Sequence, residues 1–416
     1  MTQAAHASLE DLLCASAATD LEGPRVVFSG HDDLYPTRFR SGHVTGVALA
    51  AAALASRPTG EIKIDLDHAA LISEGYRHVL RDGAPVAAPR DPLTGFYETA
   101  DRRYLFLHVN FPHHRERALA VLQAEGSRAS LESKIATWSM AEADVALAAA
   151  GAICAPVLSA DEWRQNTQRP PLIDIEKVAE STPRPADPAR VVDFTRVLAG
   201  PTCGRFLAET GAIVTRIDNP LYPDLLSYRL DANRDKKEES LDLRDAKQKA
   251  RLFQLIDEAD VFLQAYRPGV AEKLGLGAQT LCARNPGLIH ASLSAYDDHS
   301  AFAGRRGFDS AVQATSGIAL LNGQGTPKLL STSPLDYCAG FLLAFGVKEA
   351  LRRRTREGGS YIVRTSLARV ATWLLDMQHA TAPIENKQRM VDLISRYRRE
   401  SVTASGTISH IASAVF

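Results

Sequence analysis

The sequence predicts an α/β protein: a Rossmann-like parallel sheet with flanking helices, together with a second, smaller α+β region. From residue 191 onward, short apolar runs alternate with helical stretches, which is the pattern of βαβ units with right-handed crossovers. A tight Ala-Gly-Pro turn follows the first run and leads directly into a helix. The predicted strands of the sheet are 191–195, 213–218, 261–265 and 288–293, and the predicted helices between them include 205–210 and 245–258.

At 416 residues, the chain is long enough for two domains or one large two-lobed unit. Its formal net charge of −1 argues against a broad nucleic-acid-binding or anionic-membrane surface, and no apolar run reaches the roughly 18 residues of a membrane span. Five scattered cysteines and an N-terminus without a basic start indicate a cytoplasmic protein. No Gly-x-Gly-x-x-Gly or Walker loop follows a strand, which disfavours a nucleotide-dependent dehydrogenase or an ATPase.

A proline-dense segment separates two parts of the sequence. Prolines cluster at 169–171 and 181–188, where a continuous helix is disfavoured. We therefore interpret 164–190 as a linker between a first region, 1–163, and a second region, 191–416.

The first region contains a helix-turn-strand pattern that returns late in the second region. Small residues at 46–55 predict a helix, and 61–66 then alternates as a strand. Gly340 begins a similar helix that leads through a glycine turn into 360–365. This weak internal similarity favours a duplication, although such patterns also recur by chance. The first region further predicts a strand at 103–108 and a helix at 118–123.

The Ala199-Gly200-Pro201 turn lies where parallel sheets bind ligands, at the carboxyl end of a strand. Pro201 suits the first turn of a helix, since its missing N–H costs no hydrogen bond there. Backbone N–H groups around Ala199 and Gly200 are therefore candidates to bind an anion or a developing oxyanion. A tight strand–helix connection without a ligand is the alternative.

Four motifs occur in a set order over about 190–375. They are the strand and turn from Val191 to Pro201, the segment Asn233-Arg234-Asp235-Lys236-Lys237, the turn Tyr266-Arg267-Pro268-Gly269, and Asp336 ahead of a glycine-containing helix. As an ordered set, they resemble the class III CoA-transferases of the CaiB/BaiF and formyl-CoA transferase type. The resemblance implies the fold of CoA-transferase family III, with the CoA-binding Rossmann-like part and the nucleophile-bearing helix in 191–416.

The first region resembles the same family, but out of order. Residues 46–71 and 97–156 look like the part that normally follows the catalytic helix, as in a fusion of rearranged halves. Aligning Gly46 with Gly340 puts Gly42 at the position of Asp336, so we expect the first region to lack a nucleophile. Family members form homodimers; the resemblance therefore implies either a homodimer or a pseudo-dimer within one chain.

The resemblance makes Asp336 the catalytic nucleophile. Its carboxylate would attack the thioester carbonyl of an acyl-CoA to form an acyl-aspartyl anhydride, and returning CoA would give an aspartyl-CoA thioester. Coenzyme A is then a substrate, a small carboxylic acid is the acceptor, and no tightly bound cofactor is expected. The structural alternative is that Asp336 only caps the N-terminus of its helix.

The resemblance also implies ligands for coenzyme A. Basic side chains suit its phosphates, although such clusters also occur as solvated faces, and Tyr266 suits either adenine stacking or core packing. Arg196 and Leu198 stand where relatives often carry other polar ligands, and Leu198 has no side-chain donor, which leaves the acyl specificity open. The candidates are Arg196, Leu198, Ala199, Gly200, Asn233, Arg234, Lys236, Tyr266, Arg267, Lys273 and Arg306.

Two other functions fit the same features. Family racemases resemble this region but have a histidine where this chain has Phe308, and phenylalanine cannot move a proton. A non-catalytic CoA-thioester-binding relic of the fusion would also explain Leu198 and the altered order. The adjacent His113 and His114 lack further ligands at metal spacing, so we expect structural roles for them and no metal.

Overall fold

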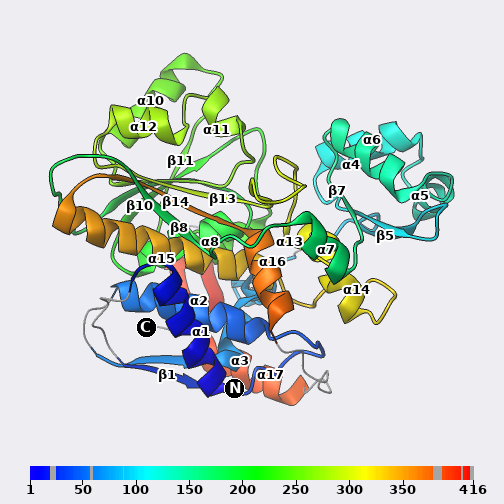
Figure 1. Ribbon diagram of the computed structural model, residues 1–416, viewed down its shortest axis with the longest axis horizontal. Helices are drawn as coiled ribbons and strands as arrows, with labels where there is room; N and C mark the ends of the chain where they lie inside the picture. Colours follow the sequence, from blue (N-terminus) through cyan, green and yellow to red (C-terminus); the bar gives the residue numbers. More distant parts are fainter. Residues whose placement is uncertain (19–24, 57–59, 88, 378–386, 404–405, 413–416) are drawn as a thin grey trace.

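The computed structural model describes residues 1–18, 25–56, 60–87, 89–377, 387–403 and 406–412. Its largest sheet has seven strands in the order β11-β10-β9-β12-β13-β14-β8, and all neighbouring pairs are parallel except β14 with β8 (Figure 1). The predicted α/β class with a parallel sheet is confirmed. The strands are β8 (Asp174–Ala179), β9 (Arg190–Phe194), β10 (Ile213–Asp218), β11 (Lys237–Ser240), β12 (Val261–Gln264), β13 (Ile289–Ser294) and β14 (Ser360–Ser366).

The central strands of this sheet are apolar on both faces because helices cover both sides. Val191 and Val192 on β9 are both buried, although they point to opposite faces. The helices of this part are α8 (Ala199–Glu209), α9 (Leu226–Ala232), α10 (Ala246–Asp257), α11 (Val270–Lys273), α12 (Ala278–Arg284) and α15 (Pro334–Glu357).

The strand order reverses between β9 and β12. From β9 the chain builds outward through β10 to β11, and it then returns to place β12 on the other side of β9. Loops leaving the carboxyl ends of β9 and β12 therefore diverge, and the crevice between them is the usual ligand site of an open α/β sheet.

The segment predicted as a linker contributes a strand instead of only connecting. Within 164–190, strand β8 pairs antiparallel with β14 at the edge of the sheet. The prolines lie at 170–171 and 183–188, so the stretch between them is free to donate ladder hydrogen bonds. Helix α7 (Ala160–Asn166) leads into this segment.

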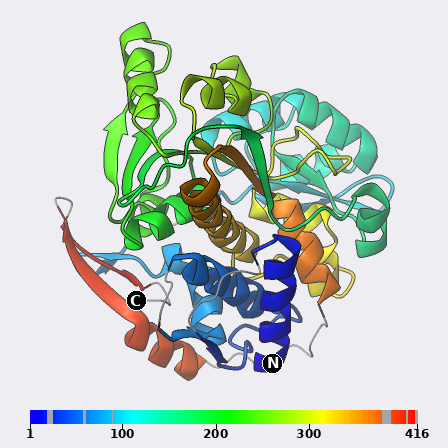
Figure 2. The ribbon, with the colours of Figure 1, turned by 60° about the vertical axis from the view of Figure 1, so that its left-hand side comes forward.

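The first region forms part of the same hydrophobic core as the large sheet. Its α1 (Thr2–Ala15), β1 (Val26–Ser29), α2 (Ser41–Ser56), β2 (Ile62–Asp65) and α3 (Leu66–Ile72) lie on the side of α15 away from the sheet (Figure 1). One buried cluster runs from Leu9 through Leu49 to Phe345. Figure 2 shows α15 at the centre of the molecule, between the sheet and these helices.

The predicted smaller α+β region is also present and has its own core. A three-stranded sheet of β5 (Gly95–Glu98), β6 (Tyr104–Leu107) and β7 (Cys154–Pro156) packs against α4 (Pro112–Leu122), α5 (Arg128–Ile135) and α6 (Met140–Ala149). The remaining elements are a short helical turn (Gly75–Arg77), β3 (Leu80–Arg81), β4 (Ala84–Pro85), α13 (Asp309–Thr315), α14 (Ile318–Asn322), α16 (Leu367–Asp376), α17 (Lys387–Tyr397), β15 (Arg398–Thr403) and β16 (Gly406–Ile411).

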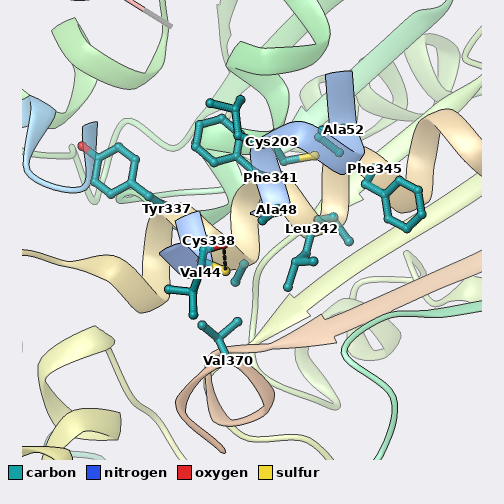
Figure 3. Close-up of a cluster of buried hydrophobic side chains, with 14 of the residues drawn as sticks. Val44, Ala48, Ala52, Cys203, Tyr337, Cys338, Phe341, Leu342, Phe345 and Val370 are labelled. Atoms are coloured by element: carbon teal, nitrogen blue, oxygen red, sulfur yellow. Dashed lines mark hydrogen bonds between the residues drawn. The ribbon is translucent and has the colours of Figure 1, made fainter. Parts of the chain in front are cut away.

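Helices α2 and α15 pack at equivalent positions of the repeated pattern. The Cys338 thiol donates to the Val44 carbonyl oxygen at 3.5 Å, and these residues are separated by the same offset as Gly340 and Gly46. Figure 3 shows Ala48 and Leu342 near this contact. A residue that touches its own equivalent is expected where a two-fold axis relates two helices. The first helices of the two helix-strand-helix units, α2-β2-α3 and α15-β14-α16, therefore pack on each other at matching positions of the pattern.

Helix α15 also approaches α8 very closely on its other side. A Cβ added to Gly340 would lie 2.5 Å from the Ala199 carbonyl oxygen and 2.8 Å from Thr202 Cβ. Only glycine fits at this crossing without moving a backbone.

Within the described ranges, no helix is both long and apolar enough to cross a bilayer.

We expect Gly340→Ala to destabilise the protein by about 1–3 kcal/mol, because the added methyl group forces α15 away from α8. Urea unfolding followed by circular dichroism measures the loss. Gly126→Ala is the matched control, since only the flexible end of Arg115 lies near that position, at 3.1 Å. Equal stability of the two variants would contradict the close packing.

Candidate active site

Asp336 lies where two cavities meet. The larger cavity, of about 590 Å³, opens at the carboxyl ends of the sheet strands, and the smaller one, of about 210 Å³, lies beside the first region. Five residues line both: Phe111, Val197, Leu198, Phe308 and Asp336. A group on Asp336 therefore has access to a large compartment on one side and a small one on the other.

The large cavity occupies the crevice expected from the strand order. Its walls come from the loops after β9, β12 and β13, with contributions from α4 and from the segment before α13. The structure brings together eight of the residues predicted from the sequence at this cavity: Arg196, Leu198, Ala199, Gly200, Tyr266, Arg267, Arg306 and Asp336.

The loop after β9 is held in an unusual conformation at the cavity wall. Val197 has a φ of 69°, which is rare for a β-branched residue. The Asp224 carboxylate fixes this conformation, because it accepts hydrogen bonds from the Val197 N–H and the Arg196 guanidinium, both at 3.1 Å. Gly200 packs directly on Thr195, because a Cβ atom added to Gly200 would lie only 2.5 Å from the Cβ atom of Thr195. The N-terminus of α8 is thereby fixed against the cavity.

Three predicted ligands of coenzyme A lie elsewhere. Lys236 is fully buried and donates to Asp193 at 2.7 Å and to the Pro201 carbonyl oxygen at 2.8 Å. Arg234 pairs with Glu209 and Asp231 at 3.2 and 3.3 Å. The charges of Lys236 and Arg234 are therefore neutralised by ion pairs inside the fold, and both side chains contact helix α8.

Asn233 is equally engaged, since its side-chain oxygen accepts from Arg216 at 2.9 Å. Asn233, Arg234 and Lys236 line neither cavity, so the prediction that they contact phosphates does not fit their positions. Lys273 is exposed on α11 and is not part of the cavity wall, although Val270 and Leu274 beside it are. Tyr266 packs on Phe194 with ring centroids 4.8 Å apart and also lines the large cavity.

Three arginines gather at the large cavity without carboxylate partners among the described residues: Arg117, Arg267 and Arg306. The pKa of Arg306 is lowered, first by burial and then by the charges of Arg267 and Arg117. Like charges held close together are costly unless an anion joins them. This cluster suits phosphate groups, which accept several charge-assisted hydrogen bonds.

Asp336 does not cap its own helix. Helix α15 starts after Ser333, and the side chain that accepts its first free N–H groups is Asp309. Asp309 Oδ2 accepts from Leu335 at 2.9 Å and from Asp336 at 3.1 Å, while Gln313 donates to Asp309 Oδ1. The N-cap alternative is therefore wrong, and the Asp336 carboxyl is left for the cavity.

Burial raises the pKa of Asp336 well above its usual range, and the nearby Asp309 carboxylate raises it further. Burial also raises the pKa of Asp309, to about 6. Asp336 is only 7% exposed. An ionised carboxylate at this position is poorly solvated, which strengthens it as a nucleophile once it forms.

The small cavity is lined mainly by residues that the sequence did not single out. They include Tyr76, Arg77, Arg90, His108, Asn110 and Tyr228. His113 and His114, which we expected to be structural, line the large cavity with their Nε2 atoms 3.1 Å apart. No group of three or more potential metal ligands is found in the part of the chain that the structure describes. The sequence did offer a signal for Asp309, because this residue directly follows Phe308, the position at which family racemases have a histidine.

The first copy of the repeated helix has no room for an acid. A Cβ on Gly42 would lie 2.2 Å from the Leu66 carbonyl oxygen and 2.5 Å from Asp32 Oδ1. Asp32 accepts from the N–H groups of Gly42 and His43 at 2.7 and 2.8 Å, as Asp309 does at α15. The helix-capping carboxylate thus occurs in both copies, but a nucleophile at the equivalent position fits only in the second.

A protein-family model described as CoA-transferase family III matches residues 187–400. The probable fatty acyl-CoA transferase Rv3272 of Mycobacterium tuberculosis is 36% identical and aligns with 46% of this chain and 52% of its own length. The succinyl-CoA–L-malate CoA-transferase alpha subunit of Chloroflexus aurantiacus is 33% identical over 46% of this chain and 49% of its own. The chain spans about half the length of the curated relatives it matches.

Two solved structures also align with part of this chain. The crystal structure of Rv3272 is 37% identical, with a TM-score of 0.43 over 47% of this chain and 57% of the other. A CAIB/BAIF family protein from Brucella suis is 27% identical, with a TM-score of 0.42 over 47% and 56%.

The raised pKa values of Asp336 and Asp309 predict how stability depends on pH. The folded protein retains protons on these groups after the unfolded chain releases them near pH 3.8. Their stabilising contribution is fully present below that pH and is lost as the pH rises through the raised pKa values of the folded protein, of which that of Asp309 is about 6. We expect Asp336→Asn to flatten this loss by up to about 1.4 kcal/mol per pH unit.

Urea unfolding between about pH 4 and pH 6 measures this slope. The exposed Asp298→Asn variant should keep the wild-type slope. An unchanged slope in Asp336→Asn would contradict a buried carboxyl at this position.

Proposed function

Because this chain belongs to CoA-transferase family III, we propose that it moves CoA between an acyl-CoA thioester and a carboxylic acid. The observation that carries the proposal is the buried Asp336 carboxyl at the junction of the two cavities. The large cavity suits the CoA moiety, and the small one suits the acyl group and the acceptor.

In the proposed reaction, Asp336 alternates between two covalent states. Its carboxylate oxygen attacks the thioester carbonyl carbon, the C–S bond breaks, and CoA leaves as thiolate. The thiolate then attacks the aspartyl carbonyl of the mixed anhydride and expels the donor acid as a carboxylate. The acceptor carboxylate attacks the carbonyl carbon of the resulting aspartyl-CoA thioester, the C–S bond breaks, and the departing CoA thiolate leaves a second mixed anhydride. The thiolate finally attacks the acceptor's acyl carbon in this anhydride, and the Asp336 carboxylate is the leaving group.

The N-terminus of α8 is the proposed stabiliser of the charge that develops on the carbonyl oxygen. The N–H groups of Ala199 and Gly200 lie in the first turn of this helix, where no preceding carbonyl accepts from them, and both residues line the cavity. Such fixed donors stabilise an oxyanion strongly in a water-poor site. Because Leu198 has no side-chain donor, the backbone carries this role alone.

The proposed CoA orientation follows from the charges and rings of the large cavity. Arg117, Arg267 and Arg306 suit the phosphates. Tyr266, backed by Phe194, suits stacking on the adenine ring. The thioester would then point inward towards Asp336.

The two alternative functions are less well supported. A racemase needs a base near Asp336, but Phe308 stands at the relevant wall. His108, whose ring centroid lies 4.5 Å from that of Phe308, has a pKa lowered by burial to about 3 and would be a weak base. A non-catalytic relic gives no reason to bury Asp336 while Asp309 caps its helix.

We further propose that the chain is a pseudo-dimer in which the first region replaces a partner subunit. Val44 and Cys338 meet at the pseudo-symmetric crossing, and the first region supplies Phe111 and His108 to the cavity walls.

All five cysteines are free, which supports the reducing, cytoplasmic setting that we propose.

The central test is trapping of the covalent intermediate. After incubation with acyl-CoA and hydroxylamine, we expect a hydroxamate on Asp336, detected by mass spectrometry of the peptide. Asp336→Asn should lose the adduct and reduce CoA exchange by more than about a thousandfold, because the nucleophile is gone. Asp298→Asn should behave as wild type. An unmodified Asp336 with every acyl-CoA donor, despite CoA exchange, would contradict the mechanism.

Asp309 is proposed as a positioning residue that also tunes Asp336. Its negative charge raises the pKa of the nucleophile, so Asp309→Asn should shift the pH–rate profile of adduct formation to lower pH. The amide oxygen still accepts the N–H groups at the start of α15. Stopped-flow kinetics at several pH values measures the profile. If Asp309 only builds the helix end, the rate falls but the profile does not move.

A further inference from the structure

Two adjacent histidines of α4 face the large cavity as a hydrogen-bonded pair. The Nε2 atoms of His113 and His114 lie 3.1 Å apart, their ring centroids lie 4.0 Å apart, and both residues line the cavity wall. A hydrogen bond between these nitrogens needs one N–H donor and one free lone pair, so the two rings cannot both be protonated at Nε2. The pair is therefore either neutral or carries a single positive charge.

Two arginines converge beside this pair because Gly151 leaves room for them. A Cβ atom added to Gly151 would lie 2.7 Å from an Arg306 guanidinium nitrogen and 3.3 Å from an Arg117 guanidinium nitrogen. Arg117 is held there by the Gly151 carbonyl oxygen, to which it donates at 3.1 Å. Neither guanidinium has a carboxylate partner among the described residues, so an anion between them would neutralise two charges at once.

The carboxylates of the large cavity are engaged elsewhere. Asp242 and Asp336 are the acidic residues of its described wall. Asp242 pairs with Arg244 at 2.7 Å, and Asp336 lies at the junction with the small cavity, near Asp309. The wall around the two histidines therefore has an excess of positive charge.

Several elements place titratable groups around the histidine pair. Tyr222 packs on His113 with ring centroids 5.4 Å apart, and Arg196 is already paired with Asp224 at 3.1 Å. The groups that face the pair are Glu116 and Arg117 on α4 itself, His108 after β6, Arg196 after β9, Tyr222 after β10 and Arg306 before α13. The arginines outweigh Glu116, so the field at the pair is positive.

This field and burial act on both rings in the same direction. The pKa of His114 is lowered to about 3, first by burial and then by the charges of His113 and Arg306. The pKa of His113 is lowered by burial first and then by the neighbouring arginines, of which Arg117 acts most strongly. Both imidazoles are therefore neutral in the protein alone near neutral pH.

We propose that the His113–His114 pair completes a phosphate-binding site at these two arginines and takes up one proton from solvent when a phosphate group of CoA binds there. This inference rests on the proposed use of the large cavity for CoA. The phosphate charge offsets the field of the arginines, so the imidazole pair becomes a stronger base in the complex. The incoming proton binds a ring nitrogen outside the Nε2–Nε2 hydrogen bond, which is therefore kept. The singly charged pair then adds a charge-assisted donor to the phosphate.

Binding and protonation at this site are linked, and the sign follows from the direction of the change. A group whose pKa rises on binding takes up a proton, and the affinity for the ligand increases as the pH falls towards that raised pKa. Wild type should therefore gain affinity for CoA over His113→Gln as the pH falls. The two proteins should bind CoA equally at about pH 8 and differ by about 3- to 10-fold at about pH 6.

Isothermal titration calorimetry with CoA alone counts the protons and needs no turnover. Titrations at about pH 6.5 in phosphate-free buffers of different ionisation enthalpy give the protons taken up per CoA bound, from the slope of the observed enthalpy. A phosphomonoester of CoA itself titrates near pH 6, so the readout is the difference between variant and wild type. We expect His113→Gln to take up at least about half a proton fewer per CoA than wild type.

Two further variants complete the test. His299→Gln removes an exposed histidine outside both cavities and should match wild type. Arg306→Gln keeps both histidines but removes part of the field, so it should also take up fewer protons, because the pair is already more basic in the protein alone.

Unchanged proton uptake in His113→Gln and Arg306→Gln would overturn this inference and leave the transferase proposal intact. An affinity loss in His113→Gln that is equal at both pH values would also overturn it, since the contact would then involve no proton. Absence of CoA binding by the wild-type protein would overturn the proposed function as well.

Discussion

The close crossing of α15 over α8 is the contact on which the site depends. Gly340 lets α15 approach until its backbone meets the Ala199 carbonyl oxygen. Asp336 lies one helical turn before Gly340 and therefore on the same face. The carboxyl is thus delivered to the N-terminus of α8 at the carboxyl end of β9. A bulkier residue at this crossing would separate Asp336, the proposed nucleophile, from the backbone N–H groups of α8 even if every side chain of the site were kept.

Helix α15 is buried on both of its sides. One side packs on α8 and the sheet, and the other packs on α2, where Val44, Ala48 and Ala52 present a flat face to Cys338 and Leu342 (Figure 3). Small residues on α2 let the helix axes come close, which compensates for their modest apolar area. The first region is consequently part of the core, and removing it would expose one side of α15, the helix that carries Asp336.

The sequence predicted what depends on local pattern. The bounds of β10 agree with the predicted 213–218, and Asp336 lies at the sheet edge as expected. It could not predict pairings between distant residues. Lys236 read as a phosphate ligand because its partner, Asp193, is 43 positions away in a buried strand. Strand β8 was missed because prolines on both sides suggested a linker, although 174–179 itself contains none.

Both regions of this chain line the two cavities beside Asp336. In the proposed mechanism, the reacting groups are Asp336, Asp309 and the N-terminus of α8, and all three belong to the second region. Arg90 and His108 line the small cavity and belong to the first region. Because Phe111 of the first region and Phe308 of the second line both cavities and pack on each other, a substitution in the first region can reshape the small cavity without moving Asp336. Under the proposed function, the first region therefore helps to shape the space beside the acyl group, while the second region holds Asp336 in place.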